Sequence, residues 1–139
     1  MNPAACNCFA LRAAARHVTA YYDQALAGLG IKTTQYSILS RLRRLGPMSI
    51  NALATELVLD RTTLGRTILP LERDKYLTIS PSPDDGRSKV LTLSPAGKAL
   101  LARAELRWAE AQLGFEKAFG KARASELRDI LGSVVETAL

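Results

Sequence analysis

The middle of the chain contains two short helical patterns joined by a brief turn, the first from Ser49 to Leu57 and the second from Asp60 onward. Ser49 and Asp60 suit the N-cap position, because their side-chain oxygens can accept hydrogen bonds from the free N–H groups of a helix start. Apolar residues recur at spacings of three and four, so each helix has one face to bury. These positions are Ile50, Leu53, Ala54 and Leu57 in the first pattern and Leu64, Ile68 and Leu71 in the second. The sequence therefore predicts a helix-turn-helix.

The second helix carries polar and basic residues opposite its apolar face, namely Thr62, Arg66 and Arg73. Hydroxyl and guanidinium groups on a helix that buries its other side suit the major groove of DNA. The same pattern also occurs in helices that only pack and whose charged face is solvated. This stretch alone therefore leaves both interpretations open.

The net charge of +6 is concentrated around the same stretch. Residues 1–40 carry +2, residues 41–103 carry +5 and residues 104–139 carry −1. A concentrated basic region attracts polyanions, and nucleic acid is the commonest of these. A membrane surface fits less well, because the basic residues do not line one face of a long amphipathic helix.

Length and composition set further limits. A chain of 139 residues favours one domain, with or without a helical arm. No apolar run reaches the roughly 18 residues of a membrane span, and the start of the chain lacks the pattern of a secretory signal. We therefore expect a cytoplasmic protein with no membrane partner. One histidine and two cysteines do not make a convincing zinc set, so we expect no metal and no cofactor.

Helical periodicity extends to both sides of the central stretch. The predicted helices span about residues 8–29, 33–45, 95–119 and 123–138, after a loose start at residues 1–7. Thr33 or Thr34 can cap the second of these, and Ser94 followed by proline is a strong start for the third. Pro70 lies inside the helix that follows Asp60, so we expect either a bend near Ile68 or an earlier end of that helix.

Alternating apolar and polar residues at Tyr76–Ser80 and at Lys89–Leu93 predict two strands. Between them, two prolines end the first strand and Asp85-Gly86 is a turn signal. The sequence therefore predicts a two-stranded hairpin whose exposed tip carries Arg87 and Lys89.

Three helices followed by a β-hairpin form a winged-helix arrangement. The segment Asp85-Gly-Arg-Ser-Lys-Val-Leu-Thr-Leu-Ser-Pro-Ala-Gly is similar to the wing signature of the MarR family of bacterial transcription regulators. Leu71-Glu-Arg-Asp-Lys-Tyr-Leu resembles the exit of that family's recognition helix into the wing. With a long helix next and helices at both termini, the resemblance covers essentially the whole chain.

The resemblance implies a mainly α fold with a small β-hairpin wing. It implies a DNA-binding lobe at about residues 33–93 and dimerisation helices at about 8–30 and 94–139. Such a protein is expected to bind a palindromic double-stranded DNA operator as a homodimer, to act as a repressor, and to be released by a small aromatic effector or by thiol oxidation.

The resemblance also assigns site residues. The residues Asp60, Arg61, Thr62, Thr63 and Arg66 match the start of the recognition helix. Arg87 matches the wing arginine that enters a minor groove, where the negative potential is enhanced, and Asp85 matches the acidic residue that orients it. The alternative for this pair is an exposed salt bridge on a turn, which contributes little. The predicted DNA-binding set is Ser49, Asp60, Arg61, Thr62, Thr63, Arg66, Asp85, Arg87 and Lys89.

Two groups of residues are candidates for sensing. Cys6 and Cys8 lie near the start of the first helix, where a helix dipole favours the thiolate. They form either a redox or soft-metal switch or an incidental pair near a loose start. The aromatic candidates for an effector cavity are His17, Tyr21, Tyr22, Tyr36 and Trp108, and aromatic residues at helical spacing also serve core or dimer packing.

Two other classes of function are alternatives to DNA binding. An enzyme is disfavoured, because the sequence shows no nucleophile–base pair, glycine-rich phosphate loop or spaced carboxylate cluster. A winged helix used only for protein contacts is the remaining alternative. Such a protein would show no affinity for DNA.

Overall fold

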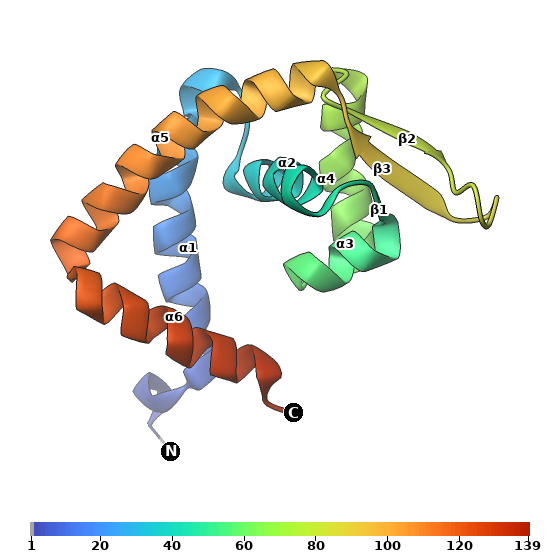
Figure 1. The fold of residues 1–139 in the computed structure, drawn as a ribbon. Coiled ribbons are helices and arrows are strands. Elements are labelled where there is room, and N and C mark those ends of the chain that lie inside the picture. Colours follow the sequence, from blue (N-terminus) through green and yellow to red (C-terminus); the bar gives the residue numbers. More distant parts are fainter. Residues whose placement is uncertain (1) are drawn as a thin grey trace.

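The computed structural model describes residues 2–139, which form α-helices and one small antiparallel sheet (Figure 1). The helices are α1 (Asn7–Leu26), α2 (Thr33–Leu45), α3 (Ile50–Leu57), α4 (Arg61–Arg73), α5 (Pro95–Phe119) and α6 (Lys121–Glu136). The strands are β1 (Met48–Ser49), β2 (Leu77–Pro81) and β3 (Lys89–Leu93), and short 3₁₀ helices cover Pro3–Ala5 and Ala27–Leu29. The predicted class, mainly α with a small β-hairpin, is confirmed.

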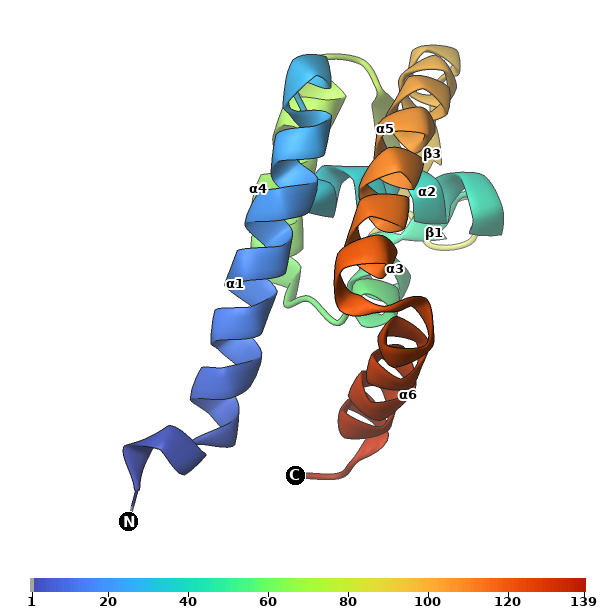
Figure 2. The same ribbon diagram turned by 90° about the vertical axis from the view of Figure 1, so that its left-hand side faces the viewer.

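The helices divide into two groups, as Figures 1 and 2 show. We call α2, α3, α4 and the sheet the lobe, and we call α1, the second half of α5 and α6 the arm. Helix α5 runs from the lobe into the arm, where it contacts α1 and α6. Gly120 lies between α5 and α6 with φ +107°, a conformation that side chains rarely adopt, and the chain bends sharply there. Both termini lie at the end of the arm that points away from the lobe in Figure 2.

Polar contacts join the arm helices to one another. The Tyr21 hydroxyl on α1 donates to the backbone oxygen of Ala111 on α5 at 2.9 Å. The guanidinium of Arg128 on α6 lies 3.7 Å from the carboxylate of Glu116 on α5. A Cβ atom at Gly114 would collide with the Tyr21 hydroxyl, so this glycine leaves room for that hydroxyl between α1 and α5.

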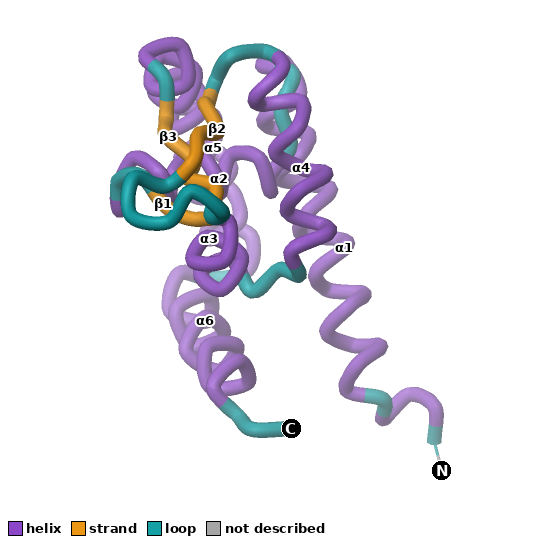
Figure 3. The backbone as a smooth tube through the Cα atoms, turned by 90° about the vertical axis from the view of Figure 1, so that its right-hand side faces the viewer, coloured by secondary structure: helices purple, strands orange, loops and turns teal. Residues whose placement is uncertain are grey.

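The sheet has the order β1-β3-β2, with both neighbouring pairs antiparallel (Figure 3). In the register of β2 and β3, Leu77 pairs with Leu93 and Ile79 with Leu91. The two residues of β1 pair with β3 on its other side, where Ser49 faces Val90. The strand order attaches the hairpin to the start of α3.

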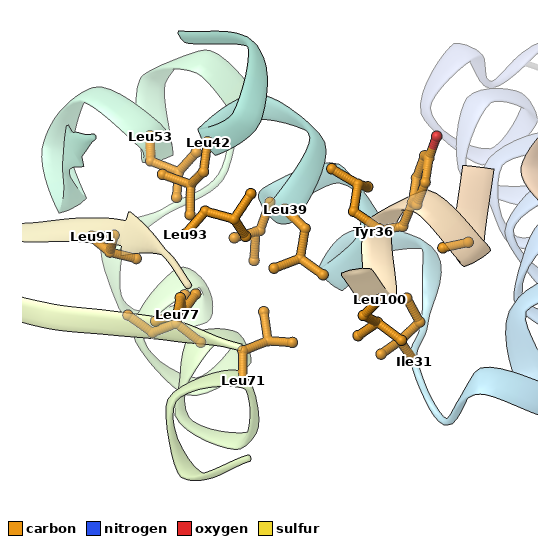
Figure 4. Close-up of a cluster of buried hydrophobic side chains, with 14 of the residues drawn as sticks. Ile31, Tyr36, Leu39, Leu42, Leu53, Leu71, Leu77, Leu91, Leu93 and Leu100 are labelled. Atoms are coloured by element: carbon orange, nitrogen blue, oxygen red, sulfur yellow. The ribbon is translucent and has the colours of Figure 1, made fainter. Parts of the chain in front are cut away.

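The core of the lobe is apolar and draws on every element of the lobe and on the first half of α5 (Figure 4). Leu39, Leu53 and Leu91 have no exposed surface, and neither have Leu64 and Leu101. Burying one leucine side chain stabilises a fold by about 1.5 to 3 kcal/mol. This core holds α3, α4 and the hairpin in a fixed mutual arrangement.

The start of α5 packs against the turn between α4 and β2. The Ser94 N–H donates to the backbone oxygen of Tyr76 at 3.1 Å, and its hydroxyl donates to that of Lys75 at 2.6 Å. A Cβ atom at Gly97 would collide with the same Tyr76 oxygen and would lie 2.7 Å from Cδ1 of Leu93. Only a glycine allows this approach of the two backbones.

Several predicted boundaries are wrong in detail. Helix α1 ends at Leu26 and continues as a 3₁₀ turn to Leu29, and the start of the chain, predicted to be loose, contains the 3₁₀ turn Pro3–Ala5. Residue 1 lies outside the described residues. Helix α4 continues past Pro70 to Arg73, so the alternative of an earlier end is wrong. Strand β2 is shifted by one residue, and β1 was not predicted.

The predicted cap of α2 is also wrong, because Lys32 occupies the N-cap position and Thr33 is the first helical residue. The Thr33 N–H donates to Oδ1 of Asp23 on α1 at 2.7 Å. The Gln35 side chain accepts a hydrogen bond from the Lys32 N–H at 3.0 Å. Contacts with another helix, which the local pattern does not reveal, therefore complete this helix start. Among residues 2–139, no helix is both long and apolar enough to cross a membrane.

Candidate nucleic-acid interface

The N-termini of α3 and α4 are capped as their sequences predict. The Ser49 hydroxyl accepts the Ala52 N–H at 3.0 Å. The Asp60 carboxylate accepts the Thr63 N–H at 2.9 Å and the Thr63 hydroxyl at 2.6 Å. The hydrogen bond from the Thr63 hydroxyl, followed by that from its N–H, lowers the pKa of Asp60 below its ordinary value. Asp60 and Thr63 are thus engaged with each other at the start of α4, which leaves Arg61 and Thr62 exposed beside them.

The turn between α3 and α4 contains a strained residue. Val58 has φ +54° and ψ +44°, the left-handed conformation that a β-branched residue rarely adopts. Its N–H group caps α3, and the Leu59 N–H donates to the oxygen of Ala54 at 2.9 Å. The Val58 side chain is 67% exposed and lines an open recess of about 650 Å³ between the two helices. The turn therefore presents an apolar group to solvent beside the start of α4.

One stripe of α4 faces away from the core. Leu64, Ile68 and Leu71 are buried, whereas Thr62, Gly65, Arg66 and Leu69, at helical spacings of three and four, lie on the other side. We call these four residues the outer stripe. Thr62 and Arg66 belong to the predicted set, whereas Gly65 and Leu69 do not. Their spacing from Thr62 is the signal that could have included them.

The wing is the turn between β2 and β3. The Asp85 carboxylate accepts the Arg87 N–H at 3.0 Å and the Ser88 hydroxyl at 3.2 Å. Asp85 therefore shapes the backbone of the turn, whereas the resemblance implied that it orients the guanidinium of Arg87. The side chains of Arg87 and Lys89 are exposed on this hairpin, which projects from the lobe in Figure 1.

Several basic residues of the lobe form ion pairs, whereas the cations of the predicted DNA-binding set do not. Arg41 and Arg44 on α2 both pair with Glu56 on α3 at 3.2 Å, and Arg43 pairs with Glu105 on α5. In contrast, the described residues form no ion pair with four cations of the predicted set. These unpaired cations are Arg61, Arg66, Arg87 and Lys89. They remain available for an external anion.

The two cysteines are exposed near the start of α1. Cys6 is the N-cap residue, and its sulfur accepts the Phe9 N–H at 3.4 Å. Cys8 lies in the first turn of the helix. The described residues contain no group of three or more histidine, cysteine or acidic side chains that could hold a metal ion.

The aromatic candidates lie in different surroundings. Tyr21 lines a shallow recess of about 330 Å³ between α1 and α5, whereas His17 is exposed on α1 and does not line this recess. Tyr36 is 9% exposed and stacks on Trp108, with ring centroids 6.1 Å apart. Burial, and then the charge of Glu105, raises the pKa of Tyr36 above its ordinary value. Tyr36 therefore takes part in the packing of α2 against α5.

Known proteins share this arrangement. The MarR family model matches residues 31–89. YxaD, an HTH-type transcriptional regulator of Bacillus subtilis, is 33% identical over 82 residues, which cover 58% of this chain and 57% of that protein's length. The organic hydroperoxide resistance transcriptional regulator of B. subtilis is 29% identical over 94% of this chain and 87% of its own length.

Solved structures extend the similarity to the full arrangement of elements. The M. tuberculosis transcriptional regulator MosR, in a crystal structure in complex with DNA, is 30% identical with a TM-score of 0.82. The alignment covers 94% of this chain and 96% of that one. It therefore includes both the arm and the lobe. The chain belongs to the MarR family and is a transcriptional regulator of that family.

Proposed function

We propose that the protein binds a palindromic double-stranded DNA operator as a homodimer and represses transcription from it. In this proposal the lobe, at about residues 33–93, places the outer stripe of α4 in a major groove and Arg87 in the adjacent minor groove. The observation that carries the proposal is the set of four unpaired cations on α4 and the wing. Exposed cations on two elements of one rigid lobe suit the paired phosphate backbones of a duplex. The DNA complex of MosR supports the same partner.

The homodimer is supported by the apolar surface of the arm. Helix α6 leaves Ile130 and Val135 60% and 63% exposed, and α5 leaves Leu113 68% exposed. The other large apolar residues exposed on the arm are Phe9, Leu11, Tyr21, Leu106, Leu131, Val134 and Leu139. Soluble monomers rarely expose apolar residues in such number on adjoining helices. We propose that residues 8–30 and 94–139 pair with the same helices of a second copy.

The variant Arg87→Ala is expected to weaken operator binding by about 1 kcal/mol for each half-site, or roughly thirtyfold for a dimer. The arginine is exposed, and the turn is held by Asp85 through the Arg87 backbone, so the alanine variant should fold normally. Fluorescence anisotropy at fixed salt, with duplexes from the DNA flanking the protein's own gene, measures the change.

The matched control is Lys117→Ala, which removes an exposed cation from the arm and should leave the affinity unchanged. If Arg87→Ala binds as tightly as the wild type, the wing does not enter a groove. If the wild type binds none of the flanking duplexes, the proposed function itself fails.

We further propose that oxidation of Cys6 releases the protein from DNA. The thiol is exposed, and it lies at a helix N-terminus where a backbone N–H already donates to the sulfur. A hydroperoxide would transfer one oxygen atom to the thiolate, giving a sulfenic acid and an alcohol. The similarity to an organic hydroperoxide resistance regulator supports this class of oxidant. A small aromatic effector beside Tyr21 is the other route to release.

Mild treatment with an organic hydroperoxide is therefore expected to lower operator affinity at least about tenfold in the wild type and in Cys8→Ser, but not in Cys6→Ser. Serine is itself a favoured N-cap residue, so Cys6→Ser should keep α1 intact. Mass spectrometry of the intact protein records oxygen addition in parallel. Unmodified thiols, or release that persists in Cys6→Ser, would refute the role of Cys6. Phenolic compounds in the same titration test the aromatic route.

A further inference from the structure

A glycine lies in the middle of the outer stripe of α4. Gly65 is the fifth residue of a thirteen-residue helix and has an ordinary helical conformation. Glycine is the least favourable residue for a helix interior other than proline. Glycine at this position therefore lowers the free energy of unfolding relative to alanine.

The free protein gives no reason for this glycine. A Cβ atom at Gly97 would collide with the Tyr76 backbone, and one at Gly114 would collide with the Tyr21 hydroxyl. Both of those glycines permit close packing within the chain. A Cβ atom at Gly65, in contrast, would have no atom within 4 Å beyond its own helix backbone and its chain neighbours, as is also true of Gly132 in α6. Any surface that approaches Gly65 closely must belong to another molecule.

The surroundings of Gly65 indicate what approaches. Thr62 and Arg66 are exposed beside it, and Leu69 is 57% exposed one turn further along. The N–H group of Gly65 is hydrogen-bonded within the helix, so the space left by the missing side chain contains no free hydrogen-bond donor. An apolar group on the partner therefore fits it best. Among the groups on the floor of the major groove, the apolar one is the C5 methyl group of thymine.

We propose that Gly65 receives the methyl group of a thymine in each half-site and so determines specificity at that base pair. This proposal rests on the proposed function, because it requires α4 to lie in a major groove. A side chain at position 65 would hold the helix away from the base, whereas the bare Cα permits contact between Leu69, the helix backbone and the methyl group. Glycine lowers the stability of the free helix, and in return it allows α4 to approach the bases more closely.

The variant Gly65→Ala tests the proposal, because its two expected effects have opposite signs. The free protein should become more stable, with a melting temperature raised by about 3 °C, since alanine favours the helix and meets nothing. Its affinity for the wild-type site should fall at least roughly tenfold, as for the loss of a base contact. Thr34→Ala, at an exposed position of α2 outside α4, the wing and the proposed dimerisation helices, is the control and should bind as the wild type does.

The site itself is obtained by selecting duplexes from a random-sequence library with the wild type and with Gly65→Ala. We expect the two consensus sites to differ at one thymine in each half-site. Replacing that thymine by deoxyuridine removes only the methyl group, and it should weaken the wild type severalfold while leaving Gly65→Ala unaffected. The loss of affinity with deoxyuridine tests the methyl contact in the unmodified protein.

The outcomes separate the two proposals. If the wild type selects no site, the proposed function fails, and the specificity role fails with it. If it selects a site but Gly65→Ala binds that site equally well, or if deoxyuridine has no effect at any position, DNA binding stands and the role of Gly65 is refuted.

Discussion

Raising the salt concentration from about 50 to 200 mM is expected to lower operator affinity by about a thousandfold or more. Each phosphate that a cation neutralises releases a counterion, and this gain in entropy shrinks as salt is added. Helix α4 and the wing present four cations without an ion-pair partner among the described residues, so a dimer presents about eight there. That number falls in the range for which such a steep dependence is typical.

Anisotropy titrations across the salt series give the slope of the logarithm of affinity against the logarithm of salt concentration. Lys89→Gln should reduce the magnitude of that slope by about one per protomer, whereas Lys117→Gln, in the arm, should not change it. A flat response of the wild type would contradict the proposal that these cations bind a duplex.

Replacing Val135 by aspartate is expected to convert the dimer into a monomer and to lower operator affinity at least about a hundredfold. Val135 lies on α6 and is 63% exposed in the single chain. In the proposed dimer this side chain is covered, and a carboxylate buried there without a partner costs several kcal/mol. A monomer engages one half-site only, so the two lobes no longer bind as a unit.

Light scattering gives the oligomeric state, and circular dichroism shows whether the helices persist. Ser125→Asp places the same charge at an exposed polar position of α6 and should remain dimeric. A dimer that survives Val135→Asp with full affinity would place the interface elsewhere.

The features that the sequence predicted well are those that local chemistry decides. Ser49, Asp60 and Ser94 cap their helices as expected, because an N-cap depends on a side chain and a backbone N–H three residues later. The apolar periodicity of α4 also identified its buried face, with Leu64 and Ile68 among the most deeply buried residues.

The features that it missed depend on distant parts of the chain. The two residues of β1 are too few to show alternation, and they form a strand only because β3 lies beside them. Thr33 resembles a cap residue, but its N–H is held by Asp23 from another helix. Gly65 was not among the predicted site residues, and the role proposed for it depends on the empty space around it, which the sequence does not show.

The wing shows a third kind of limit. The sequence places Asp85 and Arg87 two residues apart, which favours an ion pair, yet the carboxylate bonds to the backbone N–H of Arg87 and to Ser88. The sequence predicted that Asp85 and Arg87 interact, but it did not predict that the interaction uses the backbone N–H of Arg87. We therefore expect Asp85 to matter for the shape of the turn.

Ser49 belongs to two structures at once, since it pairs with Val90 of β3 and caps α3 through its hydroxyl. A movement of the hairpin is thereby passed directly to the first helix of the helix-turn-helix. The hairpin and the helix-turn-helix, which are proposed to enter neighbouring grooves, are thus connected directly through Ser49. A signal that shifts one of them shifts both, so release from a duplex should occur in one step, without a half-detached intermediate.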